Sequence, residues 1–274
     1  TLDPDLSGAW AIRGVARQQR GDTDGALADF ARAIELGPTE EGPLVNRSRL
    51  HTERRDYAAA IADATRALEL SPDHATALAM RGRARQLTGD VEGARADLKR
   101  AIEVDPEDAN AWSSWGAFAL TYDRDPREAL RAFERAVLLR PQDPGVFTNR
   151  GLTRLQLGDV AGAQEDCRLA AERDPRNASI WRNLADAEAA GGDVQAALAA
   201  ISRALVLEPR NASSWRECGR YRVQLGDIGN GISDFDRALD LDPQDANTWG
   251  LRGQAHRHLG DLPRAIADYE QMLE

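Results

Sequence analysis

The residue types that most often do chemistry in proteins are sparse in this chain of 274 residues. The histidines and cysteines are His51, His74, His256, His258, Cys167 and Cys218. His256 and His258 are two positions apart, so on a helix they would point to different faces. The metal-binding spacings His-Glu-x-x-His and Cys-x-x-Cys do not occur, and neither does a glycine-rich phosphate loop. We therefore expect no metal, no cofactor and no catalytic activity of the chain by itself.

The charge balance limits the class of partner. The formal net charge is −10, from 45 acidic against 35 basic residues. A nucleic-acid partner would require a basic stripe or patch, so we expect none. The sequence contains no run of about 18 apolar residues, so we expect no membrane-spanning segment. The remaining expectation is a protein or peptide partner.

Eight prolines recur at an almost constant spacing along the chain. They are Pro4, Pro38, Pro72, Pro106, Pro141, Pro175, Pro209 and Pro243. Every interval is 34 residues except the interval of 35 between Pro106 and Pro141. A fixed period of this length indicates a stack of one small structural unit, in which each unit packs only on its neighbours.

Each repeat predicts two helices of about 13 residues joined by a short turn. In residues 7–40, Gly21 suits the left-handed residue after a helix and Asp22 suits the N-cap of the next helix. Small residues recur where the two helices would approach closely, for example Ala26 and Ala33. A large residue recurs at the fourth position: Trp10, Leu44, Leu78, Trp112, Phe147, Trp181, Trp215 and Trp249. We expect these large side chains to fill the spaces between repeats.

This pattern resembles the tetratricopeptide repeat family over residues 7–274. The resemblance implies an all-α, right-handed superhelical solenoid of eight helix-turn-helix repeats, whose first helices line an inner groove that holds peptides or partner proteins. The expected segments are a tail of a preceding repeat at 1–6, then repeats at 7–40, 41–74, 75–108, 109–143, 144–177, 178–211, 212–245 and 246–274. The fourth repeat carries the extra residue, which we expect in the turn before Asp125. The second repeat has Arg55 where glycine is usual.

Two positions of the repeat vary together. Counting from the first residue of each repeat, position 7 is arginine in five repeats, and the same five have aspartate at position 23. The pairs are Arg13 with Asp29, Arg47 with Asp63, Arg81 with Asp97, Arg150 with Asp166, and Arg252 with Asp268. Where position 7 is Trp115 or Leu184, position 23 is alanine, and where position 7 is Cys218, position 23 is Asp234. We predict an arginine–aspartate bridge between the two helices of each of the five repeats.

The resemblance to the tetratricopeptide repeat family implies that the groove is formed by positions 2, 5, 6, 9, 12 and 13 of each repeat. In the first three and last three repeats these positions hold six arginines and three acids, a local excess of three positive charges on an acidic chain. The candidate partner-binding residues are Asn46, Arg49, Arg83, Asn149, Arg182, Asn183, Arg216, Arg220 and Arg257. They favour an acidic segment as the ligand. No three consecutive repeats carry the family's clamp for acidic C-termini, and the asparagine ladder at position 6 is interrupted.

The sequence therefore indicates a non-catalytic protein- or peptide-binding scaffold taken from a longer protein, of bacterial type by its preference for arginine over lysine. One alternative is a substrate-recruiting arm of a larger enzyme, such as a glycosyltransferase-like protein. Another is a self-assembly module that associates end to end, because Ile266, Tyr269 and Leu273 would form an open apolar edge. Cys167 and Cys218 lie too far apart in the repeat order to form a disulfide, which suits a cytoplasmic protein.

Overall fold

The computed structural model describes residues 6–273, which fall into an N-terminal block up to residue 141 and a C-terminal block from residue 142. The N-terminal block contains α1 (Ser7–Gln19), α2 (Thr23–Leu36), α3 (Glu41–Glu53), α4 (Tyr57–Leu70), α5 (Ala75–Thr88), α6 (Val91–Val104), α7 (Ala109–Phe118), η1 (Ala119–Asp123) and α8 (Pro126–Leu139). The C-terminal block contains α9 (Pro144–Gln156), α10 (Val160–Arg173), α11 (Ala178–Ala190), α12 (Val194–Leu207), α13 (Ala212–Gln224), α14 (Ile228–Leu241), α15 (Ala246–His258) and α16 (Leu262–Leu273).

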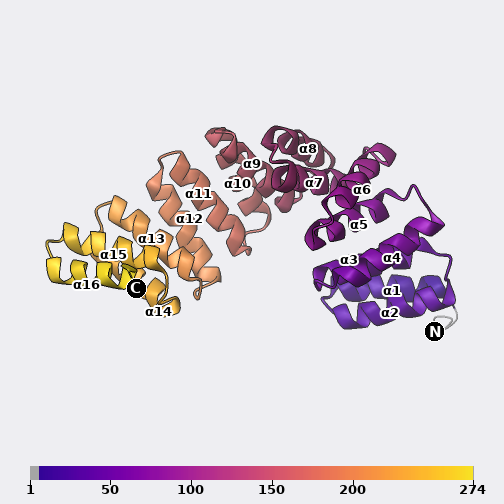
Figure 1. Cartoon of the computed structure of the whole chain (residues 1–274), viewed down its shortest axis with the longest axis horizontal. Helices are drawn as coiled ribbons and strands as arrows, with labels where there is room; N and C mark the ends of the chain where they lie inside the picture. Colours follow the sequence, from indigo (N-terminus) through magenta and orange to yellow (C-terminus); the bar gives the residue numbers. More distant parts are fainter. Residues whose placement is uncertain (1–5, 274) are drawn as a thin grey trace. The chain divides into compact units, whose positions relative to one another are not determined.

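The prediction of an all-α repeat solenoid is confirmed. Within each block, consecutive helices pack as pairs, and each pair packs on the next, as Figure 1 shows for α1–α2 beside α3–α4. No strand occurs among residues 6–273. No helix in this range is both long and apolar enough to cross a membrane.

Glycine and aspartate define the turn inside each repeat. Gly21 has a φ of 80°, in the left-handed region that glycine adopts without steric cost, and the Asp22 side chain accepts a hydrogen bond from the backbone N–H of Gly25. Five further glycines adopt this conformation: Gly89, Gly158, Gly192, Gly226 and Gly260. Among the described residues, the non-glycine residues with positive φ are Arg55, at 63°, and Arg124, at 51°.

Small residues allow the paired helices to approach closely. A Cβ atom added to Gly14 would lie 2.7 Å from the ring of Phe30, which is fully buried. Gly116 and Phe133 repeat this relationship. The core is therefore built from an aromatic or aliphatic side chain of the second helix that packs on the backbone of the first helix.

The tryptophans have a more specific role than filling space. The indole N–H of Trp181 donates to the carbonyl of Pro175, six residues earlier, at 3.0 Å. The same hydrogen bond joins Trp112 to Pro106, Trp215 to Pro209, and Trp249 to Pro243. The recurring proline and tryptophan therefore fix the connection between one repeat and the next.

The expected location of the extra residue in the fourth repeat was wrong. The connection between η1 and α8 contains only residues 124 and 125, so it is not lengthened. Instead, the end of the first helix widens into the π-helix η1. This arrangement stacks Tyr122 on Phe118, with ring centroids 5.3 Å apart, and lets the Tyr122 hydroxyl donate to the carbonyl of Gln86 at 2.7 Å. The insertion is therefore absorbed where it gains aromatic packing.

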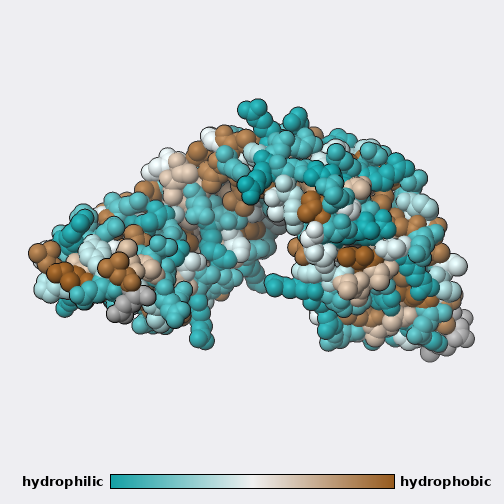
Figure 2. Space-filling model, in the orientation of Figure 1, coloured by the Kyte–Doolittle hydropathy of each residue, from teal (hydrophilic) through white to brown (hydrophobic). Residues whose placement is uncertain are grey.

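The last helix carries exposed apolar side chains. The exposed fraction is 57% for Ile266 and 83% for Leu273. Tyr269 was expected to join them but is partly buried, because its ring packs on Gly253. In Figure 2, apolar side chains are visible at the α15–α16 end among hydrophilic ones.

Candidate functional site

All five predicted arginine–aspartate bridges are present, and each is bidentate. In the third repeat, Nε and Nη2 of Arg81 donate to the two oxygens of Asp97 at 2.8 and 2.7 Å. Equivalent pairs of hydrogen bonds join Arg13 to Asp29, Arg47 to Asp63, Arg150 to Asp166, and Arg252 to Asp268. The hydrogen bonds that Arg81 donates to Asp97 raise the pKa of Arg81, although partial burial opposes this. Each bridge joins the first helix of a repeat to the second helix of the same repeat, as Arg13 and Asp29 join α1 to α2. The bridges therefore have a structural role.

A second basic residue completes these bridges, and the sequence analysis missed it. Arg85, at position 11, donates to Asp97 at 2.8 Å, so the buried carboxylate is held by two arginines. Arg17 and Arg154 contact their aspartates in the same way. The signal was in the sequence, because position 11 is arginine or histidine in all six repeats with aspartate at position 23.

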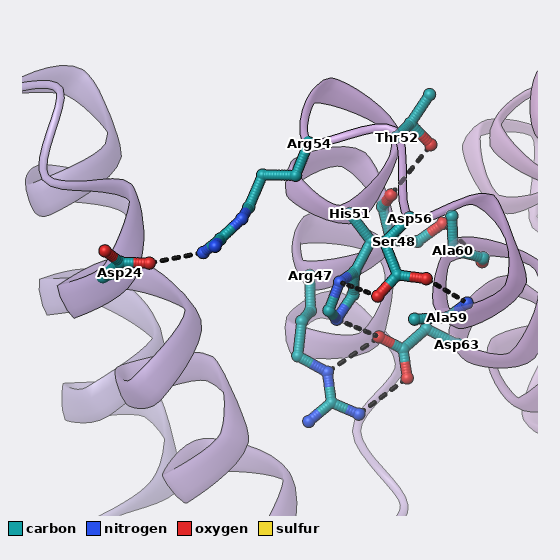
Figure 3. A network of polar contacts seen from close by, with 10 residues as sticks. All are labelled: Asp24, Arg47, Ser48, His51, Thr52, Arg54, Asp56, Ala59, Ala60 and Asp63. Carbon is teal, nitrogen blue, oxygen red and sulfur yellow. Dashed lines mark hydrogen bonds and ion pairs between the residues drawn. The ribbon is translucent and has the colours of Figure 1, made fainter.

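In the second repeat, position 11 is His51 and not arginine. Figure 3 shows Arg47 donating two hydrogen bonds to Asp63, with the His51 ring beside them. The Nε2 atom of His51 lies 3.8 Å from Asp63, which is longer than a hydrogen bond. Asp63 therefore depends on Arg47 more than Asp97 depends on Arg81. Figure 3 also shows Arg54 bridging from the end of α3 to Asp24 of α2, which ties the second repeat to the first.

A cavity lies on the face formed by the first helices of the N-terminal block. It has a volume of about 670 Å³ and is lined by residues of α3, α5 and α7, by Tyr57 at the start of α4, and by Arg55 and Arg140 outside the helices. Its charged lining residues are Arg49, Arg55, Arg83, Arg140 and Glu53. All five are exposed. The lining therefore carries four positive charges against one negative charge.

The arginines of this cavity are not neutralised by carboxylates. Among residues 6–273, the side chains of Arg55 and Arg83 make no ion pair or hydrogen bond, and the side-chain partners of Arg49 and Arg140 are neutral. Arg49 donates to the Oδ1 atom of Asn46 at 3.0 Å, and Arg140 donates to the Oδ1 atom of Asn110 at 2.8 Å. An exposed guanidinium with only an amide partner keeps its charge available for a ligand carboxylate.

The candidate arginines of the C-terminal block are arranged differently. Arg182 forms an ion pair with Glu208 at 2.6 Å, and Arg216 forms one with Asp245 at 2.7 Å. Arg220 pairs with Glu217 of the same helix. Burial lowers the pKa of Arg216, but the hydrogen bond and charge of Asp245 outweigh it, so the pKa is raised. These three arginines therefore already have carboxylate partners.

Nearby acidic groups also weaken the positive field of the C-terminal candidates. Burial raises the pKa of Asp186, and the charge of Glu217 raises it further. Asn149, Asn183 and Arg257 lie on first helices of this block, and within the described residues their side chains make no hydrogen bond or ion pair. The structure thus divides the nine candidates into an N-terminal group beside a basic cavity and a C-terminal group that is largely neutralised.

Within residues 6–273, no group of three or more histidine, cysteine, aspartate or glutamate residues is placed to hold a metal ion. The two cysteines are buried and unpaired. Burial raises the pKa of each thiol to about 12, so neither is a reactive thiolate near neutral pH.

These features define an α-helical repeat protein with an arginine-lined cavity on its N-terminal block. Models of the tetratricopeptide repeat match residues 47–112 and 187–248, residues 117–175 and 148–213, and residues 235–267. The chain belongs to the tetratricopeptide repeat family. No curated protein sequence matches it.

Solved structures share the fold at low sequence identity. MamA is 21% identical with a TM-score of 0.55, over 58% of this chain and 92% of that protein. A chain of the APC/C hetero-tetramer Cut9–Hcn1 is 17% identical with a TM-score of 0.69, over 92% of this chain but only 49% of its own length. YrrB, a TPR protein with an unusual peptide-binding site, is 23% identical with a TM-score of 0.51, over 68% of this chain and 95% of its own. The repeat fold supports a protein-binding role.

Proposed function

We propose that this chain is a protein-binding scaffold whose N-terminal block holds an acidic peptide segment of its partner. The observation that carries the proposal is the cavity with four arginines, none of which has a carboxylate partner within residues 6–273. The chain as a whole has a net charge of −10, so a basic cavity on it is not a consequence of general composition. Complementary charge gives an acidic partner both a faster encounter and a preferred register.

The chemistry of the cavity favours carboxylates. Arginine has a planar fork of donors that matches a carboxylate in two hydrogen bonds. Arg49 and Arg83 occupy the same repeat position on α3 and α5, so an extended peptide can meet one guanidinium per repeat. Asn46, Asn149 and Asn183 recur at position 6, where an amide can bond the backbone of a bound peptide.

The C-terminal candidates have a secondary role in this proposal. Arg182, Arg216 and Arg220 would have to exchange an existing ion pair for one with the ligand, which gains little free energy. Arg257 is exposed and without a carboxylate partner, so it is the remaining C-terminal contact we propose.

The wider assignment follows from the same features. We propose that the chain acts by binding and not by catalysis, in the bacterial cytoplasm, with a preference for peptides over nucleic acid. Recruitment of substrates to an enzyme is compatible with an acidic partner and stands as the second candidate. Self-association through exposed apolar residues such as Ile266 and Leu273 is the third, and sedimentation at several concentrations tests it.

Fluorescence anisotropy with short labelled peptides tests the proposal. One peptide is rich in glutamate, and its controls carry glutamine or lysine at the same positions. We expect binding of the glutamate peptide alone, in the range of about 10–100 µM, and a steep loss of affinity with salt. Equal binding of the glutamine peptide would contradict the proposal, because the arginines would then contribute nothing.

A further inference from the structure

A second, smaller cavity lies on the same face of the N-terminal block. It has a volume of about 300 Å³ and is lined by Ala11, Ile12 and Val15 of α1 and by Gly42, Pro43 and Asn46 of α3. Asn46 is the one polar residue in this lining. Ile12 is 74% exposed, an unusual state for a large aliphatic side chain on a helix face that also forms a cavity.

One hydrogen bond connects this apolar cavity to the arginine-lined cavity. Asn46 lines the apolar cavity, and its Oδ1 atom accepts a hydrogen bond from Arg49 at 3.0 Å. Arg49 in turn lines the arginine cavity. The two cavities are therefore adjacent along α3, one turn apart on the same helix face.

We propose that the two cavities form one recognition site for a peptide that carries a single bulky apolar side chain next to a run of acidic residues. The apolar side chain occupies the cavity beside Ile12, and the acidic residues face the arginines. This inference rests on the proposed function and names the class of partner sequence. Because the two contacts lie next to each other, the apolar and acidic residues must be close together in the partner chain.

The size of the apolar cavity suits one side chain. An enclosed apolar cavity of about 150 Å³ holds a benzene ring, so an open cavity of about 300 Å³ accepts one branched aliphatic or aromatic side chain. Charge decides between a peptide and a second copy of this chain as occupant. In a symmetric dimer through this face, two clusters that contain Arg49 and Arg83 would approach each other, and like charges disfavour that contact.

Three labelled peptides test the inference in the anisotropy assay. All three contain the same run of glutamates. The first has a leucine before the run, the second has a leucine after the run, and the third has alanine in place of the leucine. We expect one leucine peptide to bind about tenfold more tightly than the alanine peptide. Added salt should weaken all three peptides, because the acidic contacts are screened. The ratio of leucine to alanine affinity should stay constant with salt, because apolar burial is not screened.

Two substitutions on the protein locate the effect. Ile12→Asn removes apolar surface from an exposed side chain, so it should leave folding intact. Gly42→Leu fills the cavity from its wall, because a Cβ atom at Gly42 meets no atom within 4 Å. Both variants should reduce the leucine-to-alanine ratio to about one by weakening the binding of the leucine peptides.

The possible failures can be told apart. If the leucine and alanine peptides bind wild type equally and binding still requires the arginines, this inference is wrong and the proposed function stands. If no glutamate peptide binds, both are wrong. If Ile12→Asn changes the sedimentation of the free protein, the occupant is a second copy, and the inference is overturned. A leucine preference that survives both substitutions also overturns it, because the apolar contact then lies elsewhere.

Discussion

Asp234 and Arg222 share a single hydrogen bond of 2.8 Å, in the repeat where Cys218 replaces the arginine that five other repeats use for a bidentate bridge. The carboxylate of Asp234 is buried, and its Oδ2 atom accepts no hydrogen bond. Burial raises the pKa of Asp234, an effect that the neighbouring Cys218 and Arg222 oppose without cancelling. The seventh repeat therefore contains an incompletely satisfied buried carboxylate.

Cys218→Arg should repair this repeat. The new guanidinium restores the missing donors, and we expect the free energy of unfolding to rise by about 1 kcal/mol. The matched control is Leu184→Arg in the sixth repeat, where Ala200 offers no carboxylate and no gain is expected. Thermal unfolding of both variants at neutral pH makes the comparison. Equal effects of the two substitutions would show that the gain does not come from a bridge to Asp234.

The same variant carries a pH signature. A carboxyl with a raised folded-state pKa is destabilising when ionised, and that cost disappears as the pH falls through the folded-state pKa. Cys218→Arg should bring the pKa of Asp234 down. Its stability advantage over wild type should therefore be largest at neutral pH and shrink under acidic conditions. An advantage that is unchanged from neutral to acidic pH would argue against Asp234 as its source.

The bridges themselves can be tested by comparing two repeats. Arg47→Leu should cost more than Arg81→Leu, because Arg85 continues to hold Asp97 at 2.8 Å, whereas His51 lies 3.8 Å from Asp63. We expect about 3 kcal/mol for the first substitution and about 2 kcal/mol for the second. Urea unfolding of the two variants gives the order. The reverse order would mean that the second arginine does not support the carboxylate.

A double-mutant cycle isolates the bridge energy in the third repeat. Arg81→Leu combined with Asp97→Ala resembles the native pair Leu184 and Ala200. We expect the double variant to recover part of the loss of Arg81→Leu, because no buried carboxylate then remains without its partner. Recovery should be incomplete, since Arg85 also loses its partner. Strictly additive effects would contradict an energetic link between the two residues.

The pKa of Asp245 is shifted in the opposite direction to that of Asp234, which gives a further pH prediction. Burial raises its pKa, but hydrogen bonds from Thr248 and Arg216 outweigh this, so the pKa is below its ordinary value. A depressed pKa stabilises the fold above the unfolded-state pKa of about 3.9. Asp245→Asn keeps a good N-cap residue but removes the charge. The stability difference between wild type and Asp245→Asn should hold at neutral pH and vanish as the pH falls through the folded-state pKa. A stability difference that persists in acid would show that it comes from N-capping alone and not from the charge of Asp245.

Arg55 links stability to binding. It holds a left-handed conformation at a φ of 63°, where six other repeats have glycine, and it lines the arginine cavity. Arg55→Gly should raise the free energy of unfolding by about 0.5–1 kcal/mol and weaken binding of the glutamate peptide several-fold. Arg124→Gly is the matched control, because Arg124 has a φ of 51° but does not line the cavity. It should gain stability without losing affinity. Equal loss of affinity in both variants would remove Arg55 from the site.

The repeat period made most of the fold predictable from the sequence. The spacing of Pro38 and its equivalents gave the helical pairs, and the covariation of Arg81 with Asp97 and of its equivalents gave the bridges. The role of Arg85 was missed because the comparison was restricted to two positions. The π-helix at Ala119–Asp123 was missed because the choice between a longer turn and a wider helix depends on tertiary packing, here that of Tyr122 on Phe118.

The candidate site was less predictable than the fold. The sequence placed both Arg83, at position 9, and Arg216, at position 5, among the groove positions and so treated them alike. Only the structure shows that Arg216 already has Asp245, the N-cap residue of α15, as a partner, while the side chain of Arg83 has none. Charge at a groove position therefore does not by itself indicate an available charge, because the partner can come from a residue outside the groove positions, here Asp245.

The most direct test of the account is the affinity of the glutamate peptide for two charge-reversed variants. One variant carries Arg49→Glu and Arg83→Glu in the arginine cavity, and the other carries Arg216→Glu and Arg220→Glu in the C-terminal block. Circular dichroism first verifies that both variants are folded. The account predicts at least about a tenfold loss of affinity in the first variant and little change in the second. Unchanged binding by the first variant, or a larger loss in the second, would contradict the assignment of the acidic-peptide site to the N-terminal block.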